Sequence, residues 1–135
     1  MNPRELRAIA MRFTAAGRRV FPVELVTAAD GSRTKKPGIT RYHGTRPYAV
    51  GEIWRMPWHR ATWLGMALYP GEVGLDVDVK NGKCGDEHLR ELEDAYGALP
   101  ATLRQLTPSG GEHRLLSSRF SGRLPGRLRL PGGTL

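Results

Sequence analysis

The chain has 135 residues, of which 39% are hydrophobic, and its formal net charge is +8. This length can bury one hydrophobic core and is short for two independent domains. The single cysteine, Cys84, excludes an internal disulfide and a cysteine-based zinc site, and the lack of a long apolar run excludes a transmembrane helix and predicts a cytoplasmic protein.

The first predicted element is a helix that begins near Pro3 and ends at Gly17. Asn2 is placed to cap it and Glu5 to complete a capping box, while apolar residues at helical spacing predict one buried face. A strand follows over residues 19–26, where Pro22 favours an edge position or a bulge because proline cannot donate to a sheet. The turn signal at residues 29–32 leaves two alternatives open, a hairpin or a loop.

Residues 33–48 are predicted to form an ordered basic surface loop, because they contain glycine, proline and aromatic residues without helical or strand periodicity. Such a loop favours an anionic ligand, and a solvated basic turn is the alternative interpretation. The basic side chains that could bind such an anion are Lys35, Lys36, Arg41 and Arg46.

From residue 50 onward, two short helices are each followed by two predicted strands. After a short helix at 50–56, strands at 62–68 and 73–79 are expected to form an antiparallel hairpin, and a helix follows over 87–96. Two last strands are predicted at 102–107 and 112–117. We expect one domain over residues 1–118, with 119–135 as its basic tail rich in proline, glycine and arginine.

The strand at 73–79 carries Asp76 and Asp78. Because side chains alternate along a strand, the two carboxylates are expected to leave one face while Leu75, Val77 and Val79 leave the other. Two adjacent carboxylates repel each other, and a hard divalent cation compensates them most directly. The Asp-x-Asp pattern also occurs in calcium sites, nucleases and glycosyltransferases, so it does not specify one chemistry.

A second polar segment, Ser109-Gly110-Gly111-x-His113, narrows the interpretation. A Ser-Gly-Gly turn allows successive backbone N–H groups to face one anion, as phosphate-binding loops do. His113, two residues further on, is placed to donate to a phosphate oxygen or to transfer a proton; a purely structural histidine is the alternative.

The charge is distributed unevenly along the chain. Residues 1–70 hold 12 Lys/Arg against 4 Asp/Glu, residues 71–100 hold 3 against 8, and residues 101–135 hold 6 against 1. A basic body around an acidic centre suits a polyanion that lies across a metal-binding surface. The alternative is that the arginine excess reflects an arginine-rich genome and serves solubility.

These features, in this order, resemble the archaeo-eukaryotic primase superfamily, and most closely the bifunctional DNA primase/polymerase amino-terminal domains of plasmids, phages and prophages. The matching residues run over about positions 10–118. They are Gly17 with Val20-Phe21-Pro22, Lys35-Lys36-Pro37, Trp54, Leu75-Asp76-Val77-Asp78, Tyr96-Gly97-x-Leu99-Pro100-x-Thr102 and Thr107-Pro108-Ser109-Gly110-Gly111-x-His113.

The resemblance implies an α+β fold with an RRM-like catalytic sheet and flanking helices. It implies that Asp76 and Asp78 bind Mg²⁺ or Mn²⁺, and that His113 acts with them in catalysis. It also implies that the triphosphate is held by Lys35 or Lys36, the Ser109–Gly111 turn and His113. The partners implied are a DNA template and primer, nucleoside triphosphates and a helicase domain or partner. The candidate DNA-binding residues are Arg41, Arg46, Arg119, Arg123 and Arg127.

One departure from the family pattern concerns the third motif, an acidic residue on a later strand. After Glu112 the chain contains no Asp or Glu, so we expect either a fragment or truncated product that ends before this strand, or a shortened relative with an incomplete site. Three functions follow: template-directed nucleotidyl transfer, a catalytically incomplete nucleotide- or DNA-binding module of the same fold, and a metal-dependent nuclease.

Overall fold

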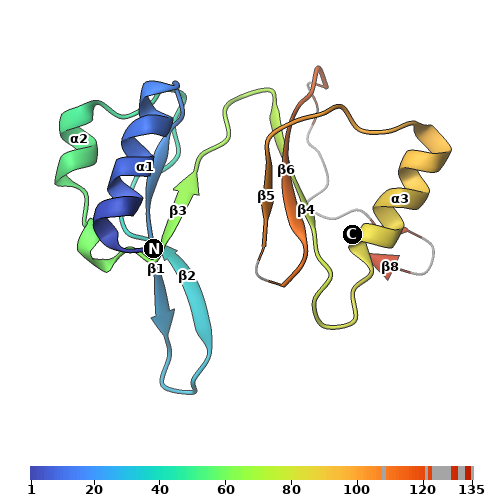
Figure 1. Ribbon diagram of the computed structural model, residues 1–135, viewed down its shortest axis with the longest axis horizontal. Helices are drawn as coiled ribbons and strands as arrows, with labels where there is room; N and C mark the ends of the chain where they lie inside the picture. The colour runs from blue at the N-terminus through green and yellow to red at the C-terminus, as the bar shows by residue number, and fades with distance from the viewer. Residues whose placement is uncertain (108, 121, 123–128, 131–132, 135) are drawn as a thin grey trace. The chain divides into compact units, whose positions relative to one another are not determined.

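A computed structural model describes residues 1–107, 109–120, 122, 129–130 and 133–134. The chain divides into two compact units, Met1–Pro70 and Gly71–Leu135. Both mix helix with antiparallel sheet (Figure 1), so the expectation of an α+β fold is confirmed. Among the described residues, no helix is both long and apolar enough to span a bilayer.

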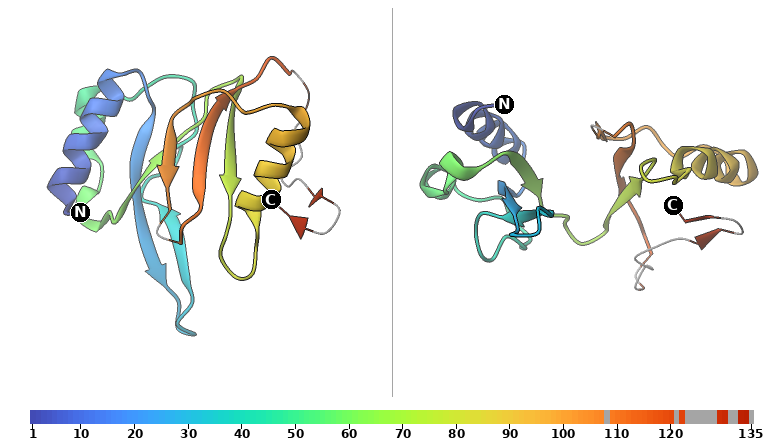
Figure 2. Two further views of the ribbon diagram at one scale, coloured as in Figure 1. Left: turned by 45° about the vertical axis from the view of Figure 1, so that its right-hand side comes forward. Right: turned by 90° about the horizontal axis from the view of Figure 1, so that it is seen from below.

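The first unit places helices against a three-stranded sheet. Its elements are α1 (Pro3–Ala15), β1 (Val20–Thr27), β2 (Arg33–Pro37), α2 (Val50–Arg55), the 3₁₀ helix η1 (Trp58–Arg60) and β3 (Trp63–Met66). The sheet order is β2-β1-β3, with both pairs antiparallel. Helix α1 contacts α2, η1 and β1, as the left view of Figure 2 shows.

The predicted cap of α1 is confirmed. The Asn2 side chain accepts a hydrogen bond from the Glu5 amide at 3.0 Å, and the Glu5 carboxylate accepts from the Asn2 amide at 2.9 Å. Leu6 and Ala10 lie on the buried face of this helix and pack with Val20 and Ile53 in the core of the unit. The capping residues therefore located the start of α1, and the apolar spacing located its inner face.

Pro22 does not lie on an edge strand, because β1 is the central strand of its sheet. The ladder between β1 and β2 ends at the pair Val23 and Pro37. Beyond that pair, the Pro22 carbonyl accepts a hydrogen bond from the Gly38 amide at 2.8 Å. Since the nitrogen and carbonyl of one strand residue point to the same side, the missing N–H of Pro22 falls where β2 has already ended.

The segment 33–48 is only partly the irregular loop that the sequence predicts. Residues 33–37 form β2 and complete a hairpin with β1, which decides between the two alternatives for the turn at 29–32. Gly31 has a φ of +81°, and the Asp30 carboxylate accepts from the Ser32 amide at 2.9 Å. This turn chemistry, rather than side-chain periodicity, brings β2 alongside β1.

The remainder of that segment is organised by a buried arginine, Arg19, whose exposed fraction is 8%. Its guanidinium donates to the carbonyls of Arg41, Tyr42 and Arg46, each at 3.0 Å, and lies over the Tyr48 ring at 3.8 Å. The loop therefore follows a course fixed from inside the unit.

The second unit contains β4 (Glu72–Val77), α3 (Gly85–Tyr96), β5 (Arg104–Leu106), β6 (Glu112–Ser117) and the short strands β7 (Arg129–Leu130) and β8 (Gly133–Thr134). Strand β6 lies between β4 and β5, and both pairs are antiparallel. The expected pairing of the last two strands, β5 and β6, is confirmed. Helix α3 contacts β4 and buries Leu89.

The predicted hairpin between residues 62–68 and 73–79 is wrong. Strand β3 pairs with β1 in the first unit, whereas β4 pairs with β6 in the second. The connecting segment contains Pro70, and the Tyr69 hydroxyl donates to the Gly17 carbonyl at 2.7 Å within the first unit. Two strands that are adjacent in sequence thus belong to different sheets.

Candidate functional site

Asp76 and His113 face each other across the β4–β6 ladder. They are direct cross-strand partners, and the His113 Nε2 atom lies 3.4 Å from Asp76 Oδ1. The Asp76 side chain is 68% exposed and that of His113 is 46% exposed. The structure thus brings together two residues that are 37 positions apart in sequence, on an open face of the sheet.

Asp78 follows directly after β4 and has different surroundings. Its side chain is only 16% exposed, and its two oxygens lie 2.6 Å from the Lys83 Nζ atom and 3.7 Å from the Lys80 Nζ atom. The hydrogen bond from Lys83 and the nearby positive charges hold the pKa of Asp78 below its ordinary value. Asp78 is therefore ionised and already compensated by two ammonium groups.

The turn between β5 and β6 packs against the end of β4. The Gly110 amide donates to the Thr107 carbonyl at 3.0 Å, the Thr107 amide donates to the Gly111 carbonyl at 2.9 Å, and Gly110 has a φ of +88°. A side chain at Gly111 would collide with the Val77 carbonyl. The Gly-Gly pair thus allows close approach to β4, and one of its amides is used within the turn.

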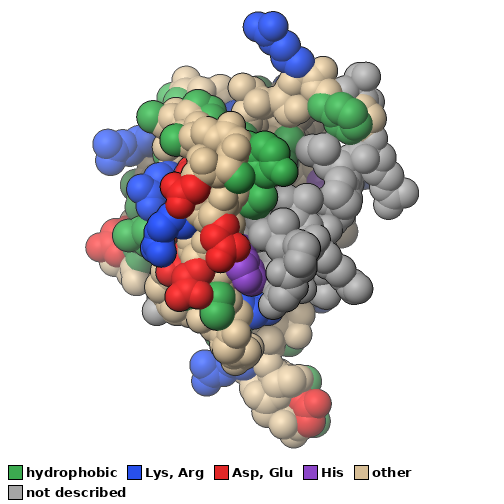
Figure 3. Space-filling view, turned by 90° about the vertical axis from the view of Figure 1, so that its right-hand side faces the viewer, with side chains coloured by type: hydrophobic (Ala, Val, Ile, Leu, Met, Phe, Trp, Pro, Cys, Tyr) green, Lys and Arg blue, Asp and Glu red, His purple; other side chains and the backbone are tan. Residues whose placement is uncertain are grey.

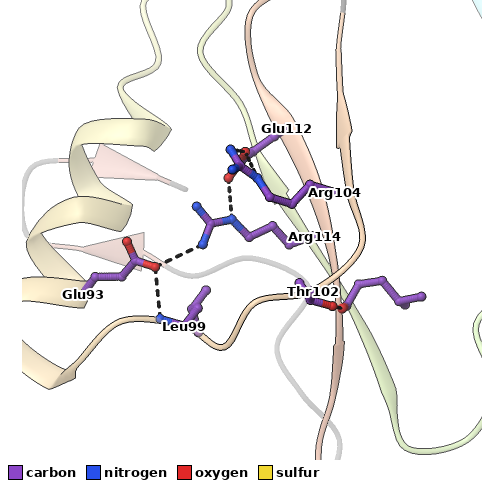
Figure 4. Close-up of polar contacts among 7 residues, drawn as sticks. Glu93, Leu99, Thr102, Arg104, Glu112 and Arg114 are labelled. Atoms are coloured by element: carbon purple, nitrogen blue, oxygen red, sulfur yellow. Dashed lines mark hydrogen bonds and ion pairs between the residues drawn. The ribbon is translucent and has the colours of Figure 1, made fainter.

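A network of ion pairs lies between the β4-β6-β5 sheet and α3, on the face opposite to Asp76 and His113 (Figure 4). The Glu112 carboxylate accepts hydrogen bonds from both Arg104 and Arg114, and Arg114 also reaches Glu93 of α3 at 3.1 Å. Burial alone would raise the pKa of Glu112, but the hydrogen bonds from the two arginines outweigh it and the pKa lies below its ordinary value.

These two sets of residues lie on opposite faces because side chains alternate along β6. Glu112 and Arg114 line a hollow of about 290 Å³ together with Leu89 and Glu93 of α3. His113, between them in sequence, faces the other way, toward Asp76. The contacts of Glu112 and Arg114 with α3 and β5 therefore fix the strand that presents His113.

This network was not predicted from the sequence, because acidic residues on a helix such as α3 are typical of a solvent-exposed face. Glu93 is instead half-buried and paired with Arg114. Figure 3 shows acidic side chains gathered beside basic ones on the face that includes α3. The sequence does contain the charged residues, with Arg104 on one predicted strand and Glu112 and Arg114 on the next. Their pairing can be inferred only when the register of the two strands is known.

The predicted phosphate-binding lysines belong to the first unit. Lys35 and Lys36 are exposed on β2, where they pair with Leu25 and Glu24 of β1. Lys35 Nζ lies 4.5 Å from the centre of the Trp63 ring. Because they are consecutive in a strand, the two lysines leave opposite faces of the sheet, so a single ligand on one face would meet only one of them.

The predicted DNA-binding arginines are dispersed. Arg41 and Arg46 lie in the loop held by Arg19, both are exposed, and Arg46 forms an ion pair with Glu52 at 3.4 Å. Arg119 is exposed just after β6. Arg123 and Arg127 lie outside the residues that the structure describes.

Asp76 and Asp78 have the chemistry that a divalent cation requires, since carboxylate oxygens are the preferred ligands of Mg²⁺ and Mn²⁺. Asp76 is accessible, and its histidine neighbour adds a nitrogen donor. Within the described ranges, however, no three His, Cys, Asp or Glu side chains gather closely enough to hold a metal ion. The donor types therefore fit a metal, with Asp76 open and Asp78 held by lysines.

Comparison with known proteins identifies one family. The family model described as "Bifunctional DNA primase/polymerase, N-terminal" matches residues 10–135, which is most of the chain. No curated protein and no solved structure shows a significant match. The match includes both carboxylates, the Ser-Gly-Gly turn and His113.

Proposed function

The chain belongs to the bifunctional DNA primase/polymerase N-terminal family, and from this premise we propose that it carries out template-directed nucleotidyl transfer on DNA. The observation that carries the proposal is the cross-strand pair of Asp76 and His113 on an open sheet face. In this proposal the Asp76 carboxylate binds a metal ion and the neighbouring His113 imidazole donates to phosphate. Nucleotidyl transfer uses both kinds of group, metal ligands near the reacting oxygens and hydrogen-bond donors around the triphosphate.

In this proposal Asp76 and Asp78 hold Mg²⁺ or Mn²⁺. When bound, such ions stabilise the attacking 3′-hydroxyl and the leaving pyrophosphate. His113, at 46% exposure, donates a hydrogen bond to a triphosphate oxygen. The Ser109 hydroxyl and the turn at Gly110 and Gly111 hold the same triphosphate. The close packing of Gly111 on Val77 supports this role, because it keeps the turn beside β4.

The basic residues are proposed to contact phosphates in two ways. Lys35 or Lys36 binds the incoming nucleotide, and since they leave opposite faces of β2, one of the two carries this role. Arg41, Arg46 and Arg119 are exposed and bind the DNA backbone, as do Arg123 and Arg127 of the basic tail in this proposal. The net charge of +8 supports attraction to a polyanion.

We further propose that the β4-β6-β5 sheet with α3 is the catalytic, RRM-like sheet, and that residues 1–118 act as one catalytic domain with 119–135 as its tail. Three antiparallel strands with a helix on one face and an open opposite face support this assignment. The proposed setting is cytoplasmic replication of a plasmid, phage or prophage, with a helicase domain or partner.

A second candidate function is a catalytically incomplete nucleotide- or DNA-binding module of the same fold. It is favoured by the absence of a third metal-holding side chain in the portion of the chain that the structure covers. Glu112, the last acidic residue in the sequence, is already committed to Arg104 and Arg114. In this case nucleotide and DNA bind, but no bond is formed.

The deciding experiment is template-dependent nucleotide incorporation with Mn²⁺, comparing the full chain with Asp76→Ala. Incorporation that Asp76→Ala abolishes supports nucleotidyl transfer at this site, whereas incorporation that survives the substitution refutes the site. Asp94→Ala is the matched control, because it removes an exposed carboxylate from α3 and should leave incorporation unchanged. Binding without incorporation supports the module, and loss of input DNA without added nucleotides indicates a nuclease.

A further inference from the structure

The loop that follows β4 folds back on the last residue of the Asp-x-Asp pair. Asn81 and Gly82 have φ values of +56° and +76°, and the Lys83 amide donates to the Lys80 carbonyl at 3.2 Å. Two central residues with positive φ are typical of a type I′ turn, for which Asn-Gly is the preferred sequence. The turn reverses the chain between two lysines.

The end of this loop is held close to Asp78. The Gly85 amide donates to the Asp78 carbonyl at 3.1 Å, and a side chain on Gly85 would come within 2.7 Å of the same oxygen. The reversal at Asn81 and the contact at Gly85 together return Lys83 to the Asp78 carboxylate. The loop thus delivers both ammonium groups to one carboxylate, at 2.6 Å and 3.7 Å.

We propose that Lys83, assisted by Lys80, is a built-in counter-ion of Asp78 that a divalent cation must displace in order to bind this carboxylate. The inference rests on the proposed function, because it takes Asp78 as a metal ligand. Asp76, by contrast, has an exposed carboxylate, and its ion-pair partner among the described residues is His113 rather than a lysine. Asp76 would therefore be available to a cation without displacement of a lysine, whereas occupancy of Asp78 depends on release of Lys83.

The geometry makes this release inexpensive. The side chains of Lys83 and Lys80 are 45% and 57% exposed, so an ammonium group that leaves Asp78 is rehydrated at once. Ion pairs at this degree of exposure are weak, and their removal should change cation affinity by about threefold to tenfold, the range that corresponds to roughly 0.6–1.4 kcal/mol. The expected effect is thus measurable without abolishing binding.

The test is a direct Mn²⁺ titration of the full chain, with free Mn²⁺ measured by electron paramagnetic resonance at constant ionic strength. Lys83→Gln should bind Mn²⁺ about threefold to tenfold more tightly than the wild type. Lys83→Arg keeps the charge and should restore the wild-type affinity, and Lys80→Gln should have a smaller effect because its ammonium is more distant. Arg90→Gln removes one exposed positive charge from α3 and serves as the control.

Each outcome is decisive. Equal affinity for wild type and Lys83→Gln, with weaker binding by Asp78→Asn, overturns the counter-ion and leaves the metal site and the proposed function intact. Equal gains in Lys83→Gln and Arg90→Gln also overturn it, since they indicate general charge. If no variant binds Mn²⁺, both the counter-ion and the metal-dependent function are refuted. A gain in Lys83→Gln that disappears when Asp78→Asn is added supports the inference, whether or not the chain incorporates nucleotides.

Discussion

Replacing Glu112 by glutamine keeps the shape of the side chain and removes the charge that Arg104 and Arg114 share. The Glu112 side chain is 9% exposed, and those of Arg114 and Arg104 are 16% and 55% exposed. Breaking a fully buried ion pair costs about 3–5 kcal/mol because one charge remains unpaired. This is the upper limit for Glu112→Gln.

Two features reduce that limit. Arg104 reaches solvent, where an ion pair is worth about 0–1 kcal/mol, and Arg114 keeps its partner Glu93 at 3.1 Å. The loss then approaches that of a hydrogen bond to a charged group, and we expect Glu112→Gln to lower the free energy of unfolding by about 2 kcal/mol. In a double-mutant cycle, the coupling of Glu112 to Arg114 should exceed its coupling to Arg104.

The assay is urea unfolding of the full chain, with the midpoint and the slope analysed separately. Arg46→Gln is the control, because it breaks an exposed ion pair with Glu52. The side chains of Arg46 and Glu52 are 67% and 41% exposed, so the substitution should lower the free energy of unfolding by less than about 0.5 kcal/mol. A loss below that value for Glu112→Gln, or a stronger coupling to Arg104 than to Arg114, would refute the role of burial in this network.

Glu112 should also make the stability of the fold depend on pH. Because the folded-state pKa of Glu112 lies below its ordinary value, its contribution to stability is complete above the unfolded-state pKa of about 4.3 and is lost as the pH falls through the folded-state pKa. The wild type should therefore lose more stability than Glu112→Gln between pH 5 and more acidic conditions. Parallel curves for the two proteins would contradict this assignment.

Three further results are expected. His113→Ala should weaken nucleoside triphosphate binding by about tenfold, through loss of a hydrogen bond to a charged group, and change Mn²⁺ affinity far less; calorimetric titration with each ligand checks this, and an unchanged nucleotide Kd would contradict it. Gly111→Ala should lower stability by about 1–3 kcal/mol through collision with the Val77 carbonyl. Gly51→Ala on α2 should not, because its Cβ would make only an ordinary contact, 3.6 Å from the Arg55 side chain. Equal losses of stability in the two variants would argue against close packing at Gly111. DNA affinity, measured by fluorescence anisotropy, should fall with salt on logarithmic axes; a flat response would favour the solubility interpretation of the arginine excess.

Local signals predicted most of the elements, because they depend on residues close in sequence. The cap formed by Asn2 and Glu5 located α1, and Gly97 correctly marked the end of α3. Pairing of distant strands was less accessible. The hairpin predicted between β3 and β4 is absent from the described sheets since each strand has a partner more than twenty residues away.

The candidate site was predicted by residue type and not by surroundings. Asp76, Asp78 and His113 can be read from the sequence, but their environments differ in ways that period-2 alternation does not express. Asp76 is open beside His113, whereas Asp78 is enclosed by the turn that carries Lys80 and Lys83. That difference arises from the left-handed backbone at Asn81 and Gly82, which returns the chain on itself.

Arg19 separates the path of the 41–48 loop from the identity of the residues in it. Its guanidinium recognises main-chain carbonyls, which every amino acid possesses, so substitutions at Arg46 can alter the surface charge without redirecting the chain. Arg41 is more restricted, because its φ of +54° lies in the left-handed region, which glycine and asparagine adopt most readily. Gly44 is an exception, because a side chain there would come within 2.7 Å of the Arg19 guanidinium. The surface charge that Arg46 contributes to the loop can therefore be changed at little cost to folding.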